Sequence, residues 1–361
     1  MPKKKKTSKK NTNQGDVILH SGNLLILGHL QMQETRKALM NDIRGLIRHK
    51  NEGIPFNIVE LKKEKKKIKF DKKYADDNLP NILEDLKVKG KITDSEHDYL
   101  KKHLDRVNGI KRTEKSYSYD MNRFVKGYDI WHMFLSHIPG IGPIVATRLI
   151  VKFGLFEKFN KISSVWRYFG YHVVCPNCTK EVPDDRANDE KDDDDDKIYK
   201  KIVPVSLNKV GVCPICGSRG VYSQRKTGMQ LDFADNMRSL GFNIGECLIR
   251  CKSPYYYNLY IEQKEIDMNR KYQPGELNKL YGRRYEKSAT QIRDIHAHRR
   301  ASRRMVKRFL AHLFIASKQI SGQRIVSRPY VEAKMGHEHI TTWQDILVMN
   351  HAPVPDIRHA S

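Results

Sequence analysis

The chain has 361 residues and a formal net charge of +25, from 67 Lys and Arg against 42 Asp and Glu. An excess of this size favours a polyanionic partner such as nucleic acid. The sequence has no uninterrupted apolar stretch of about 18 residues, and the first segment, MPKKKKTSKK, lacks the apolar core of a signal peptide. We therefore expect a soluble intracellular protein with no membrane partner. It would be cytoplasmic and nucleoid-associated, or nuclear if the host is eukaryotic.

Basic and helical sequence fills the first third of the chain. We expect residues 1–15 to form a disordered basic arm, which adds nonspecific affinity or acts as a nuclear address. Residues 16–128 are predicted to be helical, because apolar residues recur at helical spacing over 24–50 and 80–106. Gly90 is expected to break the second stretch, and the segment from Thr93 to Glu96 is expected to cap the helix that follows.

Residues 137–151, HIPGIGPIVATRLIV, are typical of two short helices joined by a glycine bend. Gly140, Ile141 and Gly142 would form the bend, so that the main chain can approach a phosphate and the amides opening the next helix face it. Arg148 and Lys152 would neutralise charge. We interpret 129–172 as a helix-hairpin-helix DNA-binding segment; the alternative is a helical corner whose glycines only solve a packing problem.

Four of the six cysteines form two Cys-Pro-x-Cys knuckles. Cys175 and Cys178 make the first, and Cys213 and Cys216 make the second. This spacing lets two thiolates of one turn bind the same tetrahedral Zn²⁺, so we predict a structural zinc ribbon over 173–224; redox dithiols or disulfides are the alternative. Cys247 and Cys251 are predicted to be small buried side chains.

An acidic run separates the two knuckles. Residues 184–196, DDRANDEKDDDDD, contain nine acidic residues, and we expect 184–197 to be a solvated disordered loop or an internal mimic of DNA. The 34 residues between Cys178 and Cys213 do not exclude one metal site, because the cost of closing a loop grows slowly with its length.

Helical sequence resumes after the second knuckle, over 229–251 and 253–268. The second stretch opens with a tyrosine cluster, which would be half-buried packing or a stacking surface for unpaired bases.

The last strong helix is predicted over 291–317, with one basic face and one apolar face. We expect the basic face to contact nucleic-acid phosphates, since the face carries no interspersed acidic partners; its members are Arg299, Arg300, Arg303, Arg304, Lys307 and Arg308. A solvated surface helix is the alternative. His296, His298 and His312 would add hydrogen-bond donors, and a metal site there is disfavoured because no carboxylate or cysteine accompanies them at ligand spacing.

These motifs resemble a known family. The stretches IPGIGPIVATRLI and FEKFNKISSVWRYFGY, then Lys226-Thr227-Gly228 and the helix with Arg238, resemble the C-terminal helix-hairpin-helix domain of the IS-one-ten, IS-one-sixteen and IS-nine-oh-two insertion-sequence transposases. The resemblance covers about residues 130–315. It implies a DNA-binding protein of a mobile element, active in transposition or recombination on double-stranded DNA.

The same resemblance implies a nuclease that this sequence does not supply in full. Family members carry an RNase H-like domain with four acidic metal ligands and a serine in the C-terminal domain, whereas the first 130 residues here contain no such tetrad. Ser223, beside Arg225 and Lys226, is the candidate nucleophile because the cations would stabilise a phosphate under attack; a serine at the ribbon edge without a chemical role is the alternative. Mg²⁺ is expected only with a nuclease activity. The second hypothesis is a noncatalytic DNA-binding protein that has lost the nuclease half.

The sequence therefore predicts a mainly α protein, with a helix-hairpin-helix domain and an inserted zinc ribbon that binds its metal through four cysteines. We expect residues 225–320 to complete the transposase-like domain and 321–361 to form a tail. A nuclease subunit or a second copy of the chain would be a further partner.

Overall fold

The computed structural model describes residues 10–53, 74–153, 159–175, 177–178, 180–183, 200–203, 212–218, 220–222, 229–230, 233–281, 284–323 and 341–355. Most of these residues are helical, as the sequence predicts. The chain divides into two compact units, Met1–Val125 and Lys126–Ser361, and each is described by itself.

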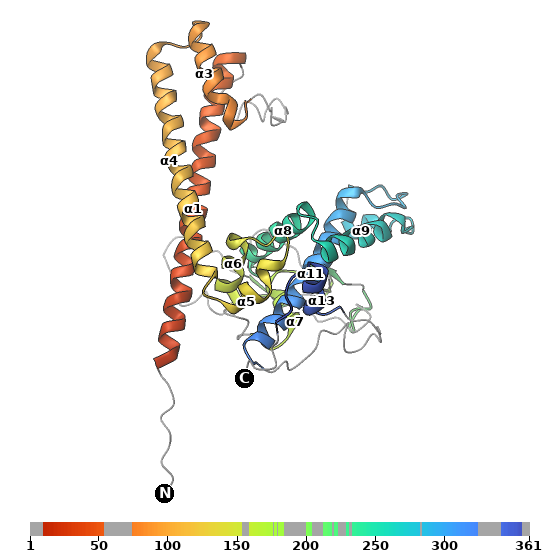
Figure 1. Cartoon of the computed structure of the whole chain (residues 1–361). Coiled ribbons are helices and arrows are strands. Elements are labelled where there is room, and N and C mark those ends of the chain that lie inside the picture. Colours follow the sequence, from red (N-terminus) through yellow and green to blue (C-terminus); the bar gives the residue numbers. More distant parts are fainter. Residues whose placement is uncertain are drawn as a thin grey trace. The chain divides into compact units, whose positions relative to one another are not determined.

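Unit 1 is a helical hairpin packed along one long helix. Its elements are α1 (Lys10–Glu52), a 3-10 turn η2 (Asp76–Asn78), α3 (Leu79–Val88) and α4 (Asp94–Val125). Figure 1 shows α4 running beside α1. Ion pairs Arg36–Glu114 at 2.8 Å and Lys50–Glu96 at 2.6 Å place early residues of one helix against late residues of the other, so the two helices are antiparallel.

The core of unit 1 lies where α1, α3 and α4 meet. Met40, Ile43 and Ile47 are buried at the i, i+3, i+7 spacing of one helix face. The predicted break and cap are confirmed: Gly90 has φ +65° between α3 and α4, and Thr93 and Glu96 exchange hydrogen bonds of 3.0 and 3.2 Å as a capping box. Residues 10–15, expected within a disordered arm, are instead the start of α1.

Unit 2 is a set of helices around α11 (Figure 1). Its helices are α5 (Asp129–Met133), η3 (Leu135–His137), α6 (Pro143–Phe153), α7 (Ile162–Tyr168), α8 (Asp235–Arg250), α9 (Pro254–Asn269), α10 (Glu276–Tyr281), α11 (Asp294–Ile320) and α13 (Trp343–Met349). Helix α7 ends in a turn at Gly170, which follows the C-cap residue Phe169 and has φ +65°.

The second half of α11 is the centre of unit 2. Met305, Val306 and Phe309 are fully buried, and burial continues to Lys318. In the first half of α11, the apolar residue Ile295 is 48% exposed. The predicted tail also belongs to this core: Trp343 of α13 is 1% exposed, and its indole Nε1 donates to Gln319 of α11 at 2.5 Å. Ile346 and Leu347 of α13 are buried with Trp343, so this helix packs on the core through an apolar face.

Short strands accompany the cysteines. β1 (Val173–Val174) pairs antiparallel with β4 (Val221–Tyr222), while β2 (Lys180–Pro183), β3 (Lys200–Val203) and β5 (Met229–Gln230) form a second sheet in the order β2-β3-β5. Met229 and Gln230 were expected at the start of a helix. They pair in parallel with β3 instead, and α8 begins at Asp235.

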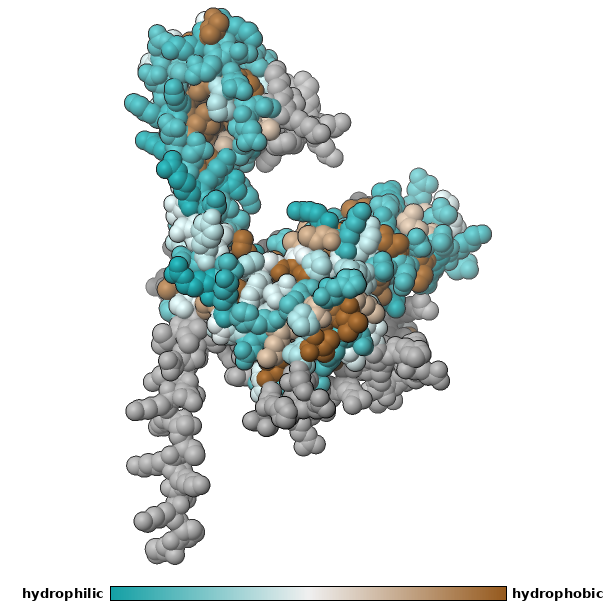
Figure 2. Space-filling view, in the orientation of Figure 1, coloured by the Kyte–Doolittle hydropathy of each residue, from teal (hydrophilic) through white to brown (hydrophobic). Residues whose placement is uncertain are grey.

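On the face drawn in Figure 2, hydrophilic side chains predominate and apolar ones form small patches. Within the described residues, no helix combines the length and the apolar character needed to cross a bilayer.

Candidate metal centre and nucleic-acid interface

The two Cys-Pro-x-Cys knuckles meet in space. The sulfurs of Cys175, Cys178, Cys213 and Cys216 all lie within 4.8 Å of one another. Four sulfurs around a tetrahedral Zn²⁺ at 2.3 Å would be about 3.8 Å apart, so this cluster needs only small shifts to hold one ion. None of the six cysteines is in a disulfide bond. The four cysteines can therefore hold a metal ion, as predicted.

Hydrogen bonds hold the second knuckle in shape and tie it to the first. The amide of Cys213 donates to the carbonyl oxygen of Ser218 at 2.9 Å, and Asn177 Nδ2 donates to Ser218 Oγ at 2.8 Å. Gly217, with φ +68°, permits the turn between them. Hydrogen bonds from Ser218 lower the pKa of the Cys216 thiol to about 6, whereas the hydrogen bond with Cys216 raises the pKa of the Cys178 thiol to about 12.

Two predicted features of this region lie outside the described residues. They are the acidic loop, 184–197, and the candidate nucleophile Ser223.

The glycine bend lies between η3 and α6. Gly140 has φ +97°, and a Cβ at this position would lie 2.6 Å from the carbonyl oxygen of Cys247 in α8. Packing against α8 therefore requires a glycine at position 140, and no approach of a ligand is needed to explain it. Gly142 differs, because it is exposed and a Cβ there would meet nothing within 4 Å. Ile141 is 4% exposed and belongs to the core.

The two cations of α6 are only partly accessible. Arg148 is half-buried, burial lowers the pKa of its guanidinium, and its Nε is buried without a hydrogen-bond partner in the described structure. Lys152 is half-buried too. The exposed part of this predicted DNA contact is therefore Gly142, which is followed by the amides of Ile144 and Val145; as the first N–H groups of α6, these have no acceptor within the helix.

The basic residues of α11 divide into paired and unpaired groups. Arg300 forms an ion pair of 3.2 Å with Asp267 of α9, which is 2% exposed, and donates to the hydroxyl of Tyr272 at 2.9 Å. Arg304 is exposed and donates to Gln263. Among the described residues, no carboxylate pairs with Arg299, Arg304, Lys307 or Arg308. The sequence alone did not reveal Asp267 as a partner, because it lies on a different helix.

Lys307 is the most enclosed of these cations. Its Nζ lies 4.3 Å from the centre of the Trp166 ring, and the indole Nε1 donates to the carbonyl oxygen of Lys307 at 3.1 Å. Burial, with the charges of Arg303 and Arg304, lowers its pKa to about 8. The indole therefore fixes one cation of the basic face in place.

Helix α8 packs against both the glycine bend and α11, but it contacts α11 away from the basic face. The bend packs on α8 at Cys247, and α8 packs on α11 where Gly245 meets Ser302. Lys307 follows Ser302 by five residues. At 100° per residue, the two side chains are therefore about 140° apart around the axis of α11. Helix α8 thus lies between the bend and the flank of α11 opposite the basic face.

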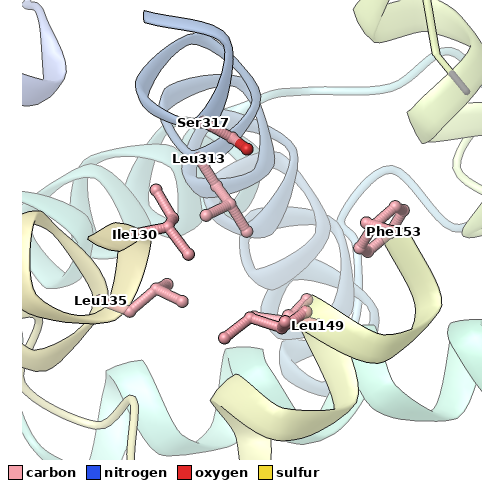
Figure 3. A pocket seen from close by; sticks show the side chains of 7 residues that line it. Ile130, Leu135, Leu149, Phe153, Leu313 and Ser317 are labelled. Carbon is pink, nitrogen blue, oxygen red and sulfur yellow. The ribbon is translucent and has the colours of Figure 1, made fainter. Parts of the chain in front are cut away.

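Helix α6 and α11 approach each other at a small apolar pocket. Figure 3 shows Leu149 and Phe153 of α6 facing it together with Leu313 and Ser317 of α11, and Ile130 and Leu135 close its other side. The lining offers almost no polar group, so the pocket is a packing feature of the core.

Each histidine of α11 contacts a tyrosine. Tyr256 lies 2.9 Å from His312, Tyr260 lies 2.8 Å from His298, and Tyr285 lies 2.7 Å from His296. No candidate metal cluster other than the four cysteines occurs in the part of the chain that is described. Tyr256 and Tyr260 are buried, which favours packing over base stacking.

Cys247 is half-buried but Cys251 is exposed, against the expectation of two buried thiols.

The chain matches no protein-family model, and neither a curated protein nor a solved structure matches it. The geometry of the cysteines and of α11, together with the family resemblance of the quoted motifs, is therefore the basis for a proposed function.

Proposed function

We propose that this chain is a DNA-binding protein that contacts phosphates through α11 and acts, like the transposases it resembles, in DNA transposition or recombination. The observation that carries the proposal is the unneutralised charge of α11. Arg299, Lys307 and Arg308 have no carboxylate partner among the described residues, although Asp267 shows that this fold can supply one.

Electrostatics favours an anionic ligand at this helix. Like charges on neighbouring turns repel, and an enclosed cation such as Lys307 loses hydration without gaining a counter-charge. A row of phosphates would supply that charge and release counterions from the nucleic acid. An ordinary solvated helix face would have its cations in water, which fits Lys307 poorly.

The helix-hairpin-helix segment would add a second, smaller contact. The exposed Gly142 and the amides of Ile144 and Val145 suit one phosphate oxygen, whereas Gly140 and Ile141 serve packing. Because α8 lies between this bend and α11, we assign the main affinity to α11.

The four cysteines would hold structural Zn²⁺ and form a zinc ribbon with β1 and β4. Thiolate sulfurs in a closed set of four suit Zn²⁺ and leave no open position for catalysis. The ribbon would keep its two knuckles together across the long intervening loop.

A salt titration tests DNA binding. Replacing Arg304 and Arg308 together by Ala should reduce the slope of log Kobs against log[salt] by about 0.9 for each phosphate that the protein no longer neutralises. Arg300→Ala is the matched control, since Asp267 already neutralises this residue and its removal should change the slope less. An unchanged slope in the double variant would remove α11 from the interface.

A nuclease assay separates the transposase from its noncatalytic alternative. Incubation with supercoiled plasmid and Mg²⁺ should give nicks or covalent adducts if the chain, with Ser223 or with a partner's active site, is a recombinase. Intact plasmid at saturating protein would favour the noncatalytic DNA-binding protein.

A further inference from the structure

An aromatic cluster surrounds His296 at the beginning of α11. The imidazole stacks on Tyr281 of α10, with ring centres 4.5 Å apart and planes 6° from parallel. The hydroxyl of Tyr285 lies 2.7 Å from Nδ1 of His296. His296 is 7% exposed and packs against both tyrosine rings.

The hydrogen bonds of Tyr285 favour one tautomer of His296. The amide of Arg293 donates to the hydroxyl oxygen of Tyr285 at 2.8 Å, which leaves the hydroxyl proton available for donation to Nδ1 of His296. Nδ1 then accepts, and Nε2 carries the hydrogen. None of the described residues accepts a hydrogen bond from Nε2.

Arginines flank His296 at the beginning of α11. Arg293 and Arg299 stand three residues before and after it, a spacing that shares one helix face, and the guanidinium carbon of Arg293 lies 5.2 Å from the centre of the Tyr285 ring. Arg284, Arg293 and Arg299 are exposed, and within the described ranges no carboxylate lies within 4.0 Å of any of them. Asp294, the acidic residue nearest in sequence, is bonded to Lys264 at 2.7 Å. Burial, and then the charges of Arg284, Arg299, Arg293 and Arg303, lower the pKa of His296, so the imidazole stays neutral with its donor in place.

We infer that Arg284, Arg293, Arg299 and the Nε2–H of His296 form a site for a phosphate monoester, the terminal phosphate of a nucleic-acid strand. A backbone phosphodiester carries one negative charge, whereas a monoester carries about −1.5 to −2 at pH 7 and has three acceptor oxygens. Several guanidinium groups and an imidazole N–H donor match the monoester better. This inference rests on the proposed function, because the remaining basic residues of α11 would bind the strand that bears the phosphate.

Binding to three oligonucleotides of one sequence tests the site. One carries a 5′-phosphate, one a 3′-phosphate and one neither, and fluorescence anisotropy of the full chain gives each Kd. We expect one phosphorylated end to bind about tenfold tighter than the unphosphorylated strand, as one charge-assisted contact would give. The preferred end identifies which terminus the site takes.

Variants separate this site from the rest of α11. Arg284→Gln with Arg299→Gln should abolish the preference for the phosphorylated end. Arg304→Gln with Arg308→Gln, the matched control on the same helix, should weaken binding of all three oligonucleotides by the same factor. In labelled protein, the ¹⁵N signal of His296 Nε2 should shift only with the preferred oligonucleotide.

The two proposals fail in different ways. Equal Kd values for the three oligonucleotides in the unaltered protein would overturn the monoester site and leave DNA binding intact. A phosphate preference that survives Arg284→Gln with Arg299→Gln would also overturn it. No binding of any oligonucleotide would contradict both proposals.

Discussion

Asp267 Oδ1 lies 3.2 Å from Nη2 of Arg300, and the aspartate is almost completely buried. This contact crosses from α9 to α11 and neutralises one of the six cations expected to face DNA. It divides the basic face into a residue that stabilises the fold and residues that remain available to a ligand.

Asp267→Asn should therefore destabilise unit 2 and strengthen DNA binding. The substitution leaves the half-buried Arg300 charge without its partner, at a cost of about 2 kcal/mol, reduced from a fully buried pair because Arg300 is 28% exposed. Urea unfolding measures the free-energy change, with the exposed Glu265→Gln as control. If the stability of both variants is equal, the pair contributes nothing to the fold.

Lys307 should make stability depend on pH in the alkaline range. Its folded-state pKa of about 8 lies below the ordinary value of 10.5, so the unfolded chain binds more protons between those values. The free energy of unfolding contributed by this group therefore rises as pH increases from about 8 to 10.5. Lys307→Met should remove this rise and stabilise the protein at pH 7 by about 2 kcal/mol.

Thermal or urea unfolding of the unaltered protein and of Lys307→Met is measured at pH 7, 8, 9 and 10. The difference between their free energies of unfolding should shrink as the pH rises. The exposed Lys271→Met is the control for the removal of a positive charge. A difference that stays constant with pH would mean that Lys307 titrates normally.

Cys175→Ser or Cys213→Ser should release metal. Each substitution removes one ligand of the four-sulfur set, and because a preformed site rarely persists in the unfolded chain, metal loss should unfold the ribbon. Elemental analysis of purified protein should give about one zinc per chain before substitution and much less after it. Cys251→Ser, outside the cluster, should retain the metal; identical metal content in all variants would exclude this site.

Gly140 and Gly142 should respond differently to alanine. Gly140→Ala forces a Cβ against the Cys247 carbonyl at positive φ, and we expect a destabilisation of about 3 kcal/mol. Gly142→Ala should change stability by less than about 1 kcal/mol, because the space around it is open. Its effect should fall on DNA affinity if the bend contacts a phosphate.

Chemical unfolding and DNA titration of both variants test this assignment. Equal stability of the two variants would contradict the packing role of Gly140. Unchanged affinity of Gly142→Ala would leave α11 as the DNA contact and remove the bend from the interface.

Local signals in the sequence determined the helices and the cysteine cluster. The capping box at Thr93, the break at Gly90 and the two knuckles depend on residues a few positions apart, whose geometry the backbone fixes directly. The helical period likewise placed the buried Met305 and Phe309 on one face of α11.

Only the tertiary structure decided which of those charges are free. Asp267 and Trp166 are distant in sequence from Arg300 and Lys307, and a helical period does not identify the side chains that another helix brings against it. The same limit applies to Gly140 and to Trp343. Position 140 must be a glycine because of the nearby carbonyl of Cys247, and Trp343, in the expected tail, is buried in the core. Packing between distant segments sets these roles, because desolvation and ion pairing depend on distance in space and not on spacing along the chain.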